Sequence, residues 1–265
     1  MRKITLDYLQ SLQQNGEKIT ALTAYDATFS RIISESEIEL MLVGDTLGMV
    51  VRGLSSTLPV TVDDICYHTQ CVAQGNTGTF LIGDLPFASY ATVADTLRNA
   101  ARVMQAGAMM VKMEGGSWLS ESVRALAQIG IPVCGHLGLT PQSVHSLSGY
   151  KVQGRAEAHA KTLLSDAIAL EQAGMRLLVL ECVPRALAAE IARSVTIPVI
   201  GIGAGPECDG QILVTYDMLG LHPGKPYTFV QNFMEAAGGD IAGALQCYRD
   251  AVKKGTFPLD QHSFS

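Results

Sequence analysis

Short apolar runs alternate along the chain with longer segments in which apolar residues recur every three or four positions. Nearly continuous apolar runs are typical of parallel strands buried on both faces, and the longer spacing is typical of amphipathic helices. Seven strands are predicted, at Ile19–Ala24, Leu40–Gly44, Phe80–Gly83, Met109–Met113, Ile131–Gly135, Leu177–Leu180 and Ile197–Ile202.

Helices are predicted between these strands, over residues 61–75, 92–107, 119–130 and 157–174. Thr61 and Thr92 open two of them with capping patterns, and Gly107 and Gly174 stand where left-handed cap residues are wanted. We also expect a helix over 5–14 that covers the barrel floor and one over 229–254 that closes the barrel.

The regular alternation predicts an α/β protein, and 265 residues match the roughly 250 that a (β/α)8 barrel needs. No linker divides the chain, so residues 1–265 are predicted to form a single domain. The pattern does not decide where the eighth strand lies. Ile212–Val214 is strand-like, but few residues separate it from Gly205. Either the seventh helix is reduced or this segment is itself helical.

Composition narrows the function classes. Hydrophobic residues make up 48% of the chain, which argues against disorder, and the net charge of −6 without a basic cluster argues against nucleic acid and anionic membranes as partners. No apolar run approaches a membrane span, and the N-terminus lacks a signal-peptide core. The six cysteines form no C-x-x-C pair. We therefore expect free thiols and a cytoplasmic protein.

Polar side chains end five consecutive predicted strands. They are Asp45, Asp84, Lys112 with Glu114, His136, and Glu181. Lys112 and Glu114 are two positions apart and so point to the same side of their strand. In barrels the C-terminal ends of the strands carry the active site. The sequence therefore predicts that these groups converge.

Several carboxylates in one cavity repel one another unless a cation neutralises them. Oxygen ligands alone favour Mg²⁺ over zinc. We place the metal on Asp45 and Asp84, with Glu114 bound directly or through water. The alternative is that these acids cap the helices that follow them.

Other signals are weaker. Gly201–Pro206 resembles a dinucleotide-binding loop but carries Pro206 at the last glycine position, so we interpret it as a tight passage out of a strand. The remaining histidines are interpreted as surface or structural residues: His68, His145, His159, His222 and His262.

Several longer motifs resemble the ketopantoate hydroxymethyltransferase family. They are Thr20–Asp26, Met41–Asp45, Ser56–Thr61, Pro132–Gln142, Gly149–Arg155, Ile200–Gly205 and His262–Phe264, and the similarity runs from about residue 18 to the C-terminus. The resemblance implies a TIM-type barrel of the phosphoenolpyruvate/pyruvate-like group, assembled as a homodecamer. It implies one Mg²⁺ per subunit and 5,10-methylenetetrahydrofolate as co-substrate. The reaction would convert 3-methyl-2-oxobutanoate to 2-dehydropantoate, on the route to pantothenate.

The resemblance also implies residue roles. Asp45 and Asp84 would hold the metal and contact the metal-bound substrate, with Glu114 also at the metal. Lys112 and His136 would bind the substrate, and Glu181 would accept the proton from C3.

One position departs from the family pattern. Thr46 stands where the family usually has serine after the first metal aspartate. Its hydroxyl can still bond the substrate, but the added methyl restricts χ1 and can tighten the pocket.

Two alternatives remain at this stage. One is a Mg²⁺-dependent 2-oxo acid lyase or mutase on the same barrel, which would need no folate. The other is a non-catalytic barrel that binds a small acid. It is disfavoured because a buried carboxylate cluster is costly to keep without a ligand.

Overall fold

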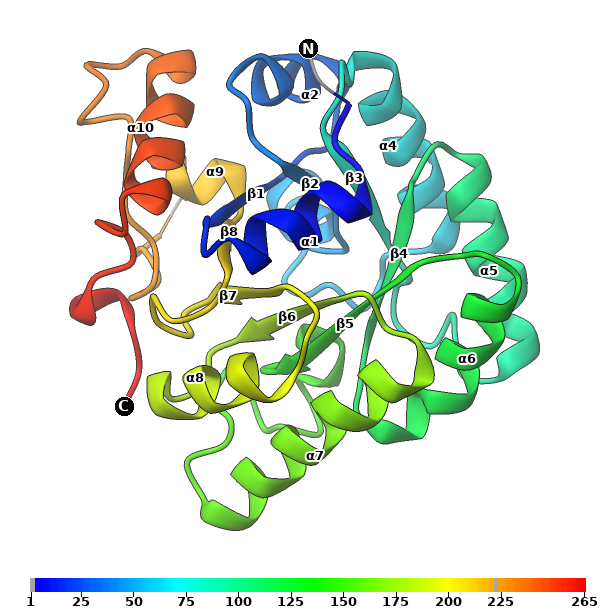
Figure 1. Ribbon diagram of the computed structural model, residues 1–265. Helices are drawn as coiled ribbons and strands as arrows, with labels where there is room; N and C mark the ends of the chain where they lie inside the picture. Colours follow the sequence, from blue (N-terminus) through cyan, green and yellow to red (C-terminus); the bar gives the residue numbers. More distant parts are fainter. Residues whose placement is uncertain (1–2, 222–223) are drawn as a thin grey trace.

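The computed structural model describes residues 3–221 and 224–265 (Figure 1). Within them, parallel strands close into a barrel in the order β1 to β8, with β8 pairing back onto β1. The strands are β1 Ile19–Thr23, β2 Leu40–Val43, β3 Phe80–Asp84, β4 Met110–Glu114, β5 Val133–Gly138, β6 Leu177–Glu181, β7 Val199–Ile202 and β8 Gly210–Leu213. The predicted (β/α)8 barrel is confirmed.

Helices connect and cover the strands. The α-helices are α1 Leu6–Gln14, α2 Ala27–Glu35, α3 Leu47–Val50, α4 Val62–Gly75, α5 Val93–Gln105, α6 Ser120–Gln128, α7 Glu157–Ala173, α8 Arg185–Ser194, α9 Thr215–Met218 and α10 Ile241–Lys253. Short 3-10 helices lie at η1 Ser117–Leu119, η2 Pro141–Ser143 and η3 Asp260–His262. The predicted caps are confirmed: Thr61 and Thr92 accept from the third backbone N–H of α4 and α5, and Gly174 ends α7 in the left-handed region.

The open question of the eighth strand is resolved in favour of a reduced seventh helix. β8 begins at Gly210, earlier than predicted, and residues 203–209 connect it to β7 without a helix. Gly210 is required there, because a Cβ at this position would lie 2.3 Å from the carbonyl oxygen of Ile19 on β1. The backbones of β1 and β8 therefore approach closely where the barrel closes.

The prediction of a helix over 229–254 is wrong before Ile241. Gly238 and Gly239 have φ angles of 63° and 88°, which a right-handed helix does not allow. Asp240 then caps α10 by accepting a hydrogen bond from the N–H of Gly243. The helix thus begins where the chain first supplies a cap after the two glycines.

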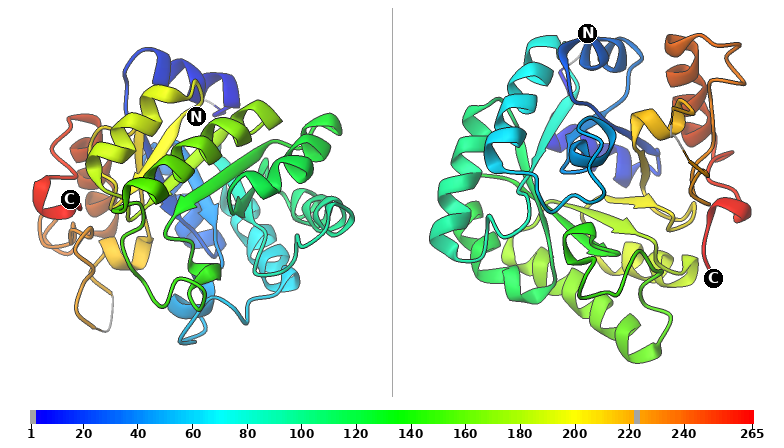
Figure 2. Two further views of the ribbon diagram at one scale, coloured as in Figure 1. Left: turned by 90° about the horizontal axis from the view of Figure 1, so that it is seen from below. Right: turned by 180° about the vertical axis from the view of Figure 1, so that it is seen from behind.

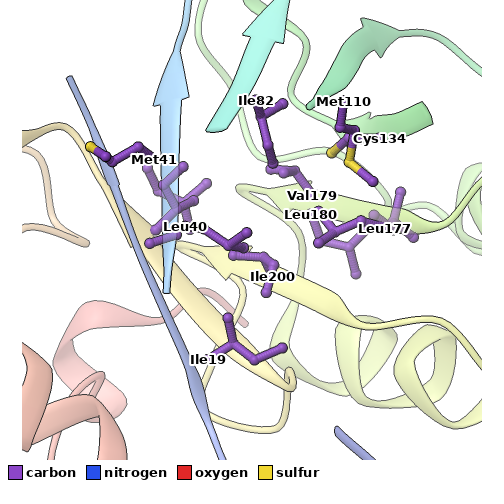
Figure 3. Close-up of a cluster of buried hydrophobic side chains, with 14 of the residues drawn as sticks. Ile19, Leu40, Met41, Ile82, Met110, Cys134, Leu177, Val179, Leu180 and Ile200 are labelled. Carbon is purple, nitrogen blue, oxygen red and sulfur yellow. The ribbon is translucent and has the colours of Figure 1, made fainter. Parts of the chain in front are cut away.

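Apolar side chains fill the lower part of the barrel interior. Figure 3 shows members of this buried cluster, contributed by strands around the barrel: Ile19, Leu40, Ile82, Met110, Cys134, Leu177, Val179 and Ile200. The polar site residues at the ends of the strands lie directly beyond this apolar layer, toward the C-terminal end of the barrel.

The N-terminal helix α1 lies at the end of the barrel where the strands begin, opposite the long segment 139–156 (Figure 2, left). Leu9 and Leu12 are buried, and the N–H of Ile4 donates to the carbonyl of Gly78, just before β3. These contacts support the single-domain assignment, which stays a prediction. In the part of the chain that the structure describes, no helix has the length and apolar character needed to cross a membrane.

Candidate active site

Strand periodicity carries the polar residues to the C-terminal end of the barrel interior. Asp84, His136 and Glu181 each follow an interior apolar residue by two positions, after Ile82, Cys134 and Val179 respectively. Side chains two apart on a strand share a face, so the polar groups lie directly above the apolar layer. These polar residues belong to the strands themselves, since β3, β5 and β6 run further than predicted.

The structure brings three predicted metal ligands together. Carboxylate oxygens of Asp45, Asp84 and Glu114 all lie within 4.8 Å of one another, and the three side chains are buried. The capping alternative is wrong for these acids. The helices that follow are preceded by other residues, Thr46, Thr92 and Leu119, at their N-cap positions.

Lys112 lies inside the carboxylate group. Its Nζ is 2.8 Å from Asp84 Oδ2 and 3.0 Å from Glu114 Oε1. Although burial opposes its charge, Asp84 and Glu114 raise the pKa of Lys112 well above its usual range. Burial likewise opposes ionisation of Glu114, but Lys112 and His136 lower the pKa of Glu114 to about 2. This ion pair is therefore charged throughout the neutral range.

His136 bridges two carboxylates. Its Nδ1 is 3.1 Å from Glu114 Oε1, and its Nε2 is 3.2 Å from Glu181 Oε2. Only the Nδ1 contact has hydrogen-bond geometry, whereas Nε2 lies within ion-pair distance of Glu181. A carboxylate beside each ring nitrogen favours the doubly protonated imidazolium. Burial lowers the pKa of His136, but Glu114 and Glu181 outweigh it and raise the value to about 9.

Asp45 differs from its neighbours in having no cation beside it. Among the described residues, no lysine, arginine or histidine nitrogen lies within 4.0 Å of its carboxylate. Burial and the charges of Asp84 and Glu114 raise the pKa of Asp45 well above its usual range. Among the residues that the structure describes, none pairs directly with ionised Asp45 to neutralise its charge.

Charge balance of the whole group supports the same conclusion. Four carboxylates, from Asp45, Asp84, Glu114 and Glu181, face one lysine and one imidazolium, which leaves two negative charges. A divalent cation would neutralise them, and an all-oxygen donor set is what Mg²⁺ prefers. The residues present therefore fit the metal that the sequence predicts.

The group lies at the base of a cavity of about 870 Å³, within the usual range for small-molecule sites. All predicted site residues, Thr46 included, line this cavity. Thr46 is half-buried, and its hydroxyl makes no hydrogen bond to the residues that the structure describes. It is available to a ligand.

Sequence reasoning missed Gln142 and Tyr90. Gln142 is 5% exposed and contacts both Asp45 and Glu114, and the Tyr90 hydroxyl contacts Gln142. Gln142 is the last residue of Pro132–Gln142, the longest motif shared with the family, and that position could have indicated a role in the site. Nothing in the spacing around Tyr90 indicates its role, since it lies in a loop.

The weaker sequence signals have structural explanations where the structure describes them. Gly203 and Gly205 have φ angles of 61° and 88°, so the glycine-rich segment is a tight passage out of β7, as predicted. The six cysteines are free thiols. Outside the site, three histidine rings bond nearby backbone atoms (His68, His159 and His262), and His145 is exposed. His222 lies outside the described residues.

Comparison with known proteins identifies the family. The family model described as ketopantoate hydroxymethyltransferase matches residues 3–260. The chain belongs to the ketopantoate hydroxymethyltransferase family. Among its relatives, 3-methyl-2-oxobutanoate hydroxymethyltransferase of Alcanivorax borkumensis is 58% identical over 98% of this chain and 99% of that protein. The enzyme of the same name from Pseudomonas fluorescens strain SBW25 is 57% identical over the full length of both chains.

Solved structures of more distant proteins share the barrel of this ketopantoate hydroxymethyltransferase family member. Phosphonopyruvate hydrolase aligns with a TM-score of 0.61 and 11% identity, over 81% of this chain and 80% of that chain. The 2,3-dimethylmalate lyase of the PEP mutase/isocitrate lyase superfamily aligns with a TM-score of 0.54 and 15% identity, over 74% and 70%. At such low identity these likenesses establish the fold alone, and they agree with the predicted (β/α)8 barrel.

Proposed function

We propose that this protein transfers a hydroxymethyl group from 5,10-methylenetetrahydrofolate to 3-methyl-2-oxobutanoate, giving 2-dehydropantoate for pantothenate biosynthesis. The observation that carries this proposal is the match of the whole chain to relatives named for that activity, at 57–58% identity. The site geometry supports it, because a buried carboxylate group beside a lysine suits chemistry on a small, negatively charged oxo acid.

Asp45, Asp84 and Glu114 would hold one Mg²⁺ per subunit, since their oxygens already converge and no described side chain forms an ion pair with Asp45. When bound, the metal supplies Lewis acidity that polarises a keto oxygen and favours enolisation. Lys112 brings a fixed positive charge to the same place and would offset the carboxylate of the oxo acid. The Thr46 hydroxyl on the cavity wall would donate a hydrogen bond to the substrate.

Glu181 is the proposed base for the C3 proton. Its side chain lines the cavity and is 16% exposed, so it can reach a bound substrate. His136 is the competing candidate, but both of its ring nitrogens face carboxylates, so it serves better as a donor. In this scheme His136 orients Glu181 through the 3.2 Å contact and leaves the other carboxylate oxygen free for the proton.

Aromatic side chains at the mouth of the cavity suit the folate. Tyr227 and Phe229 stack with ring centroids 5.4 Å apart and an interplanar angle of 3°, and Tyr150 is 49% exposed beside the same cavity. Flat aromatic rings of this kind stack well on a pteridine. Exposed Lys151 on the same wall would pair with the glutamate tail of the folate.

The test is proton NMR of the protein in D₂O with 3-methyl-2-oxobutanoate, Mg²⁺ and 5,10-methylenetetrahydrofolate, with parallel samples that lack folate or contain a chelator. The proposal expects 2-dehydropantoate only when folate and metal are both present, and C3 exchange without folate as a separate enolisation step. A lyase or mutase would instead consume a 2-oxo acid without folate. Folded, metal-loaded protein that gives neither product nor exchange would refute the proposed substrate.

Assembly and location extend the same proposal. A homodecamer of 28.2 kDa chains would have a mass of about 282 kDa (10 × 28.2), which sedimentation analysis can measure. The free cysteines suit a reducing compartment such as the cytoplasm.

A further inference from the structure

Gln142 connects the C-terminal ends of four successive strands, β2 to β5, at the base of the cavity. It lies in η2, after β5, and its backbone N–H donates to Glu114 Oε2 at 3.0 Å. Its side-chain Nε2 donates to Asp45 Oδ2 and to the carbonyl of Leu85, each at 3.0 Å. One buried residue thus bonds two of the proposed metal ligands through separate groups.

Tyr90 fixes which way the amide of Gln142 points. Two acceptors lie near the Tyr90 hydroxyl, Gln142 Oε1 at 2.6 Å and the carbonyl oxygen of Glu114 at 3.1 Å. The hydroxyl has one proton and donates it to the nearer Gln142 Oε1, so the amide oxygen faces Tyr90 and the NH₂ group faces Asp45. The carbonyl of Leu85 also requires a donor, which agrees with this orientation. The hydroxyl itself accepts from the N–H of Glu114 at 3.3 Å, so Tyr90 is held by the strand that carries the metal ligand.

This arrangement matters because like charges meet in the site. Ionised Asp45 and Glu114 repel each other, and both are buried where water screens them little. A hydrogen-bond donor held against each carboxylate keeps the carboxylates close together despite their repulsion. It also stabilises the charged form of each carboxylate. The Lys112 ammonium does this for Asp84 and Glu114, and the Gln142 amide does it for Asp45.

We propose that Gln142 is a positioning residue that holds Asp45 and Glu114 in the geometry that binds the divalent cation, and that Tyr90 acts through Gln142 by fixing its amide. The inference rests on the metal site of the proposed function. Gln142 bonds the metal ligands directly, and Tyr90 bonds Gln142. Removing residues that bond metal ligands typically weakens metal binding by about 10- to 100-fold.

The experiment measures Mn²⁺ binding to the full-length protein, without substrates, from the electron paramagnetic resonance signal of free Mn²⁺. Gln142→Leu is expected to weaken binding about 10- to 100-fold. The matched control is Gln211→Leu, because Gln211 is equally buried on β8 but bonds the carbonyl of Gly205 outside the cavity. The control is expected to keep wild-type affinity, and metal-free melting temperatures would show which variants are folded.

Tyr90→Phe keeps the ring and removes only the hydroxyl. It therefore tests whether the hydrogen bond from Tyr90 to Gln142 supports metal binding, even if Gln142→Leu does not fold. Emission of Trp118, the only tryptophan in the sequence, checks that the ring is in place, because Trp118 stacks on Tyr90 at 6.2 Å. Tyr90→Phe is expected to weaken Mn²⁺ binding about threefold to tenfold, the equivalent of one hydrogen bond. In the Gln142→Leu background the same change should have no further effect.

If the wild type binds Mn²⁺, two results would overturn the inference. One is folded Gln142→Leu, or folded Tyr90→Phe, that binds Mn²⁺ as tightly as the wild type. The other is an additive loss in the double variant, which would mean that Tyr90 does not act through Gln142. Wild-type protein that binds no Mn²⁺ would refute the metal site of the proposed function and this inference with it. Because the assay contains no substrate, a wrong substrate assignment would leave its result unchanged.

Discussion

Replacing Glu181 with glutamine would remove the proposed proton acceptor while keeping the size of the side chain. Glutamine retains an oxygen that can accept from His136 Nε2, which lies 3.2 Å from Glu181 Oε2 in the native protein. The loss of stability should therefore stay within about 1 kcal/mol. Glu181 is not one of the three converging metal carboxylates, so Mn²⁺ affinity should also be unchanged.

The catalytic loss should be much larger than the structural one. A positioned general base contributes about 10²- to 10⁴-fold, which corresponds to about 2.7–5.5 kcal/mol of activation free energy. An amide cannot accept the C3 proton, so we expect kcat to fall by that factor. C3 exchange in D₂O should fall in parallel, because it depends on the same proton transfer.

The assay combines kcat with the exchange rate from proton NMR, both measured at saturating Mg²⁺. Glu207→Gln is the matched control, because Glu207 lies in the connection between β7 and β8, pairs with Arg185 and does not line the cavity. It is expected to retain nearly normal kcat. Near-normal turnover and exchange in Glu181→Gln would refute the assignment, and His136 would be the next base to test.

Three further predictions concern the neighbouring groups. Lys112→Met should lower the free energy of unfolding in urea of metal-free protein by about 3–5 kcal/mol, because Asp84 and Glu114 lose their buried partner, and Mg²⁺ should restore part of it. Unchanged stability would mean that the carboxylates of Asp84 and Glu114 reach water once Lys112 is removed. Burial opposes protonation of His136, but Glu114 raises its pKa from 6.5 to about 9. In metal-free protein, protonated His136 should therefore stabilise the fold fully below pH 6.5, and this stabilisation should be lost as the pH rises through about 9. The measurement is the difference in free energy of unfolding between the wild type and His136→Gln across this pH range. A difference that does not change with pH would contradict the prediction. Thr46→Ser should change KM for the oxo acid by up to about fourfold, the worth of one methyl, with kcat unchanged. Identical kinetics would show that the methyl is silent.

Most of the fold could be predicted from the sequence because burial leaves a local record. Continuous apolar runs located seven strands, and cap residues such as Thr61, Thr92 and Gly174 located helix ends. The prediction failed where local pattern and tertiary context disagree. Residues 229–240 contain apolar residues at helical spacing, yet Gly238 and Gly239 adopt left-handed angles and the helix begins only at Ile241.

The candidate site was also predictable in part. The position of each polar residue at a strand end indicated that Asp45, Asp84, Lys112, Glu114 and His136 would converge. Position at a strand end did not indicate Gln142 or Tyr90. They are 52 positions apart, neither belongs to a β-strand, and their hydrogen bond forms only after the loops that carry them are brought together.

The sequence by itself determined the order of strands and helices and the kinds of chemical group at the strand ends, because side-chain periodicity and capping act over a few residues. Only the tertiary structure decided how these groups pair. Barrel closure sets the distances between strands, so it alone decides that Lys112 pairs with Asp84 and that His136 lies between Glu114 and Glu181. It also decides that no described residue places a cation within 4.0 Å of Asp45. The need for a divalent cation follows from those distances, since charge balance in a buried site depends on which groups meet there.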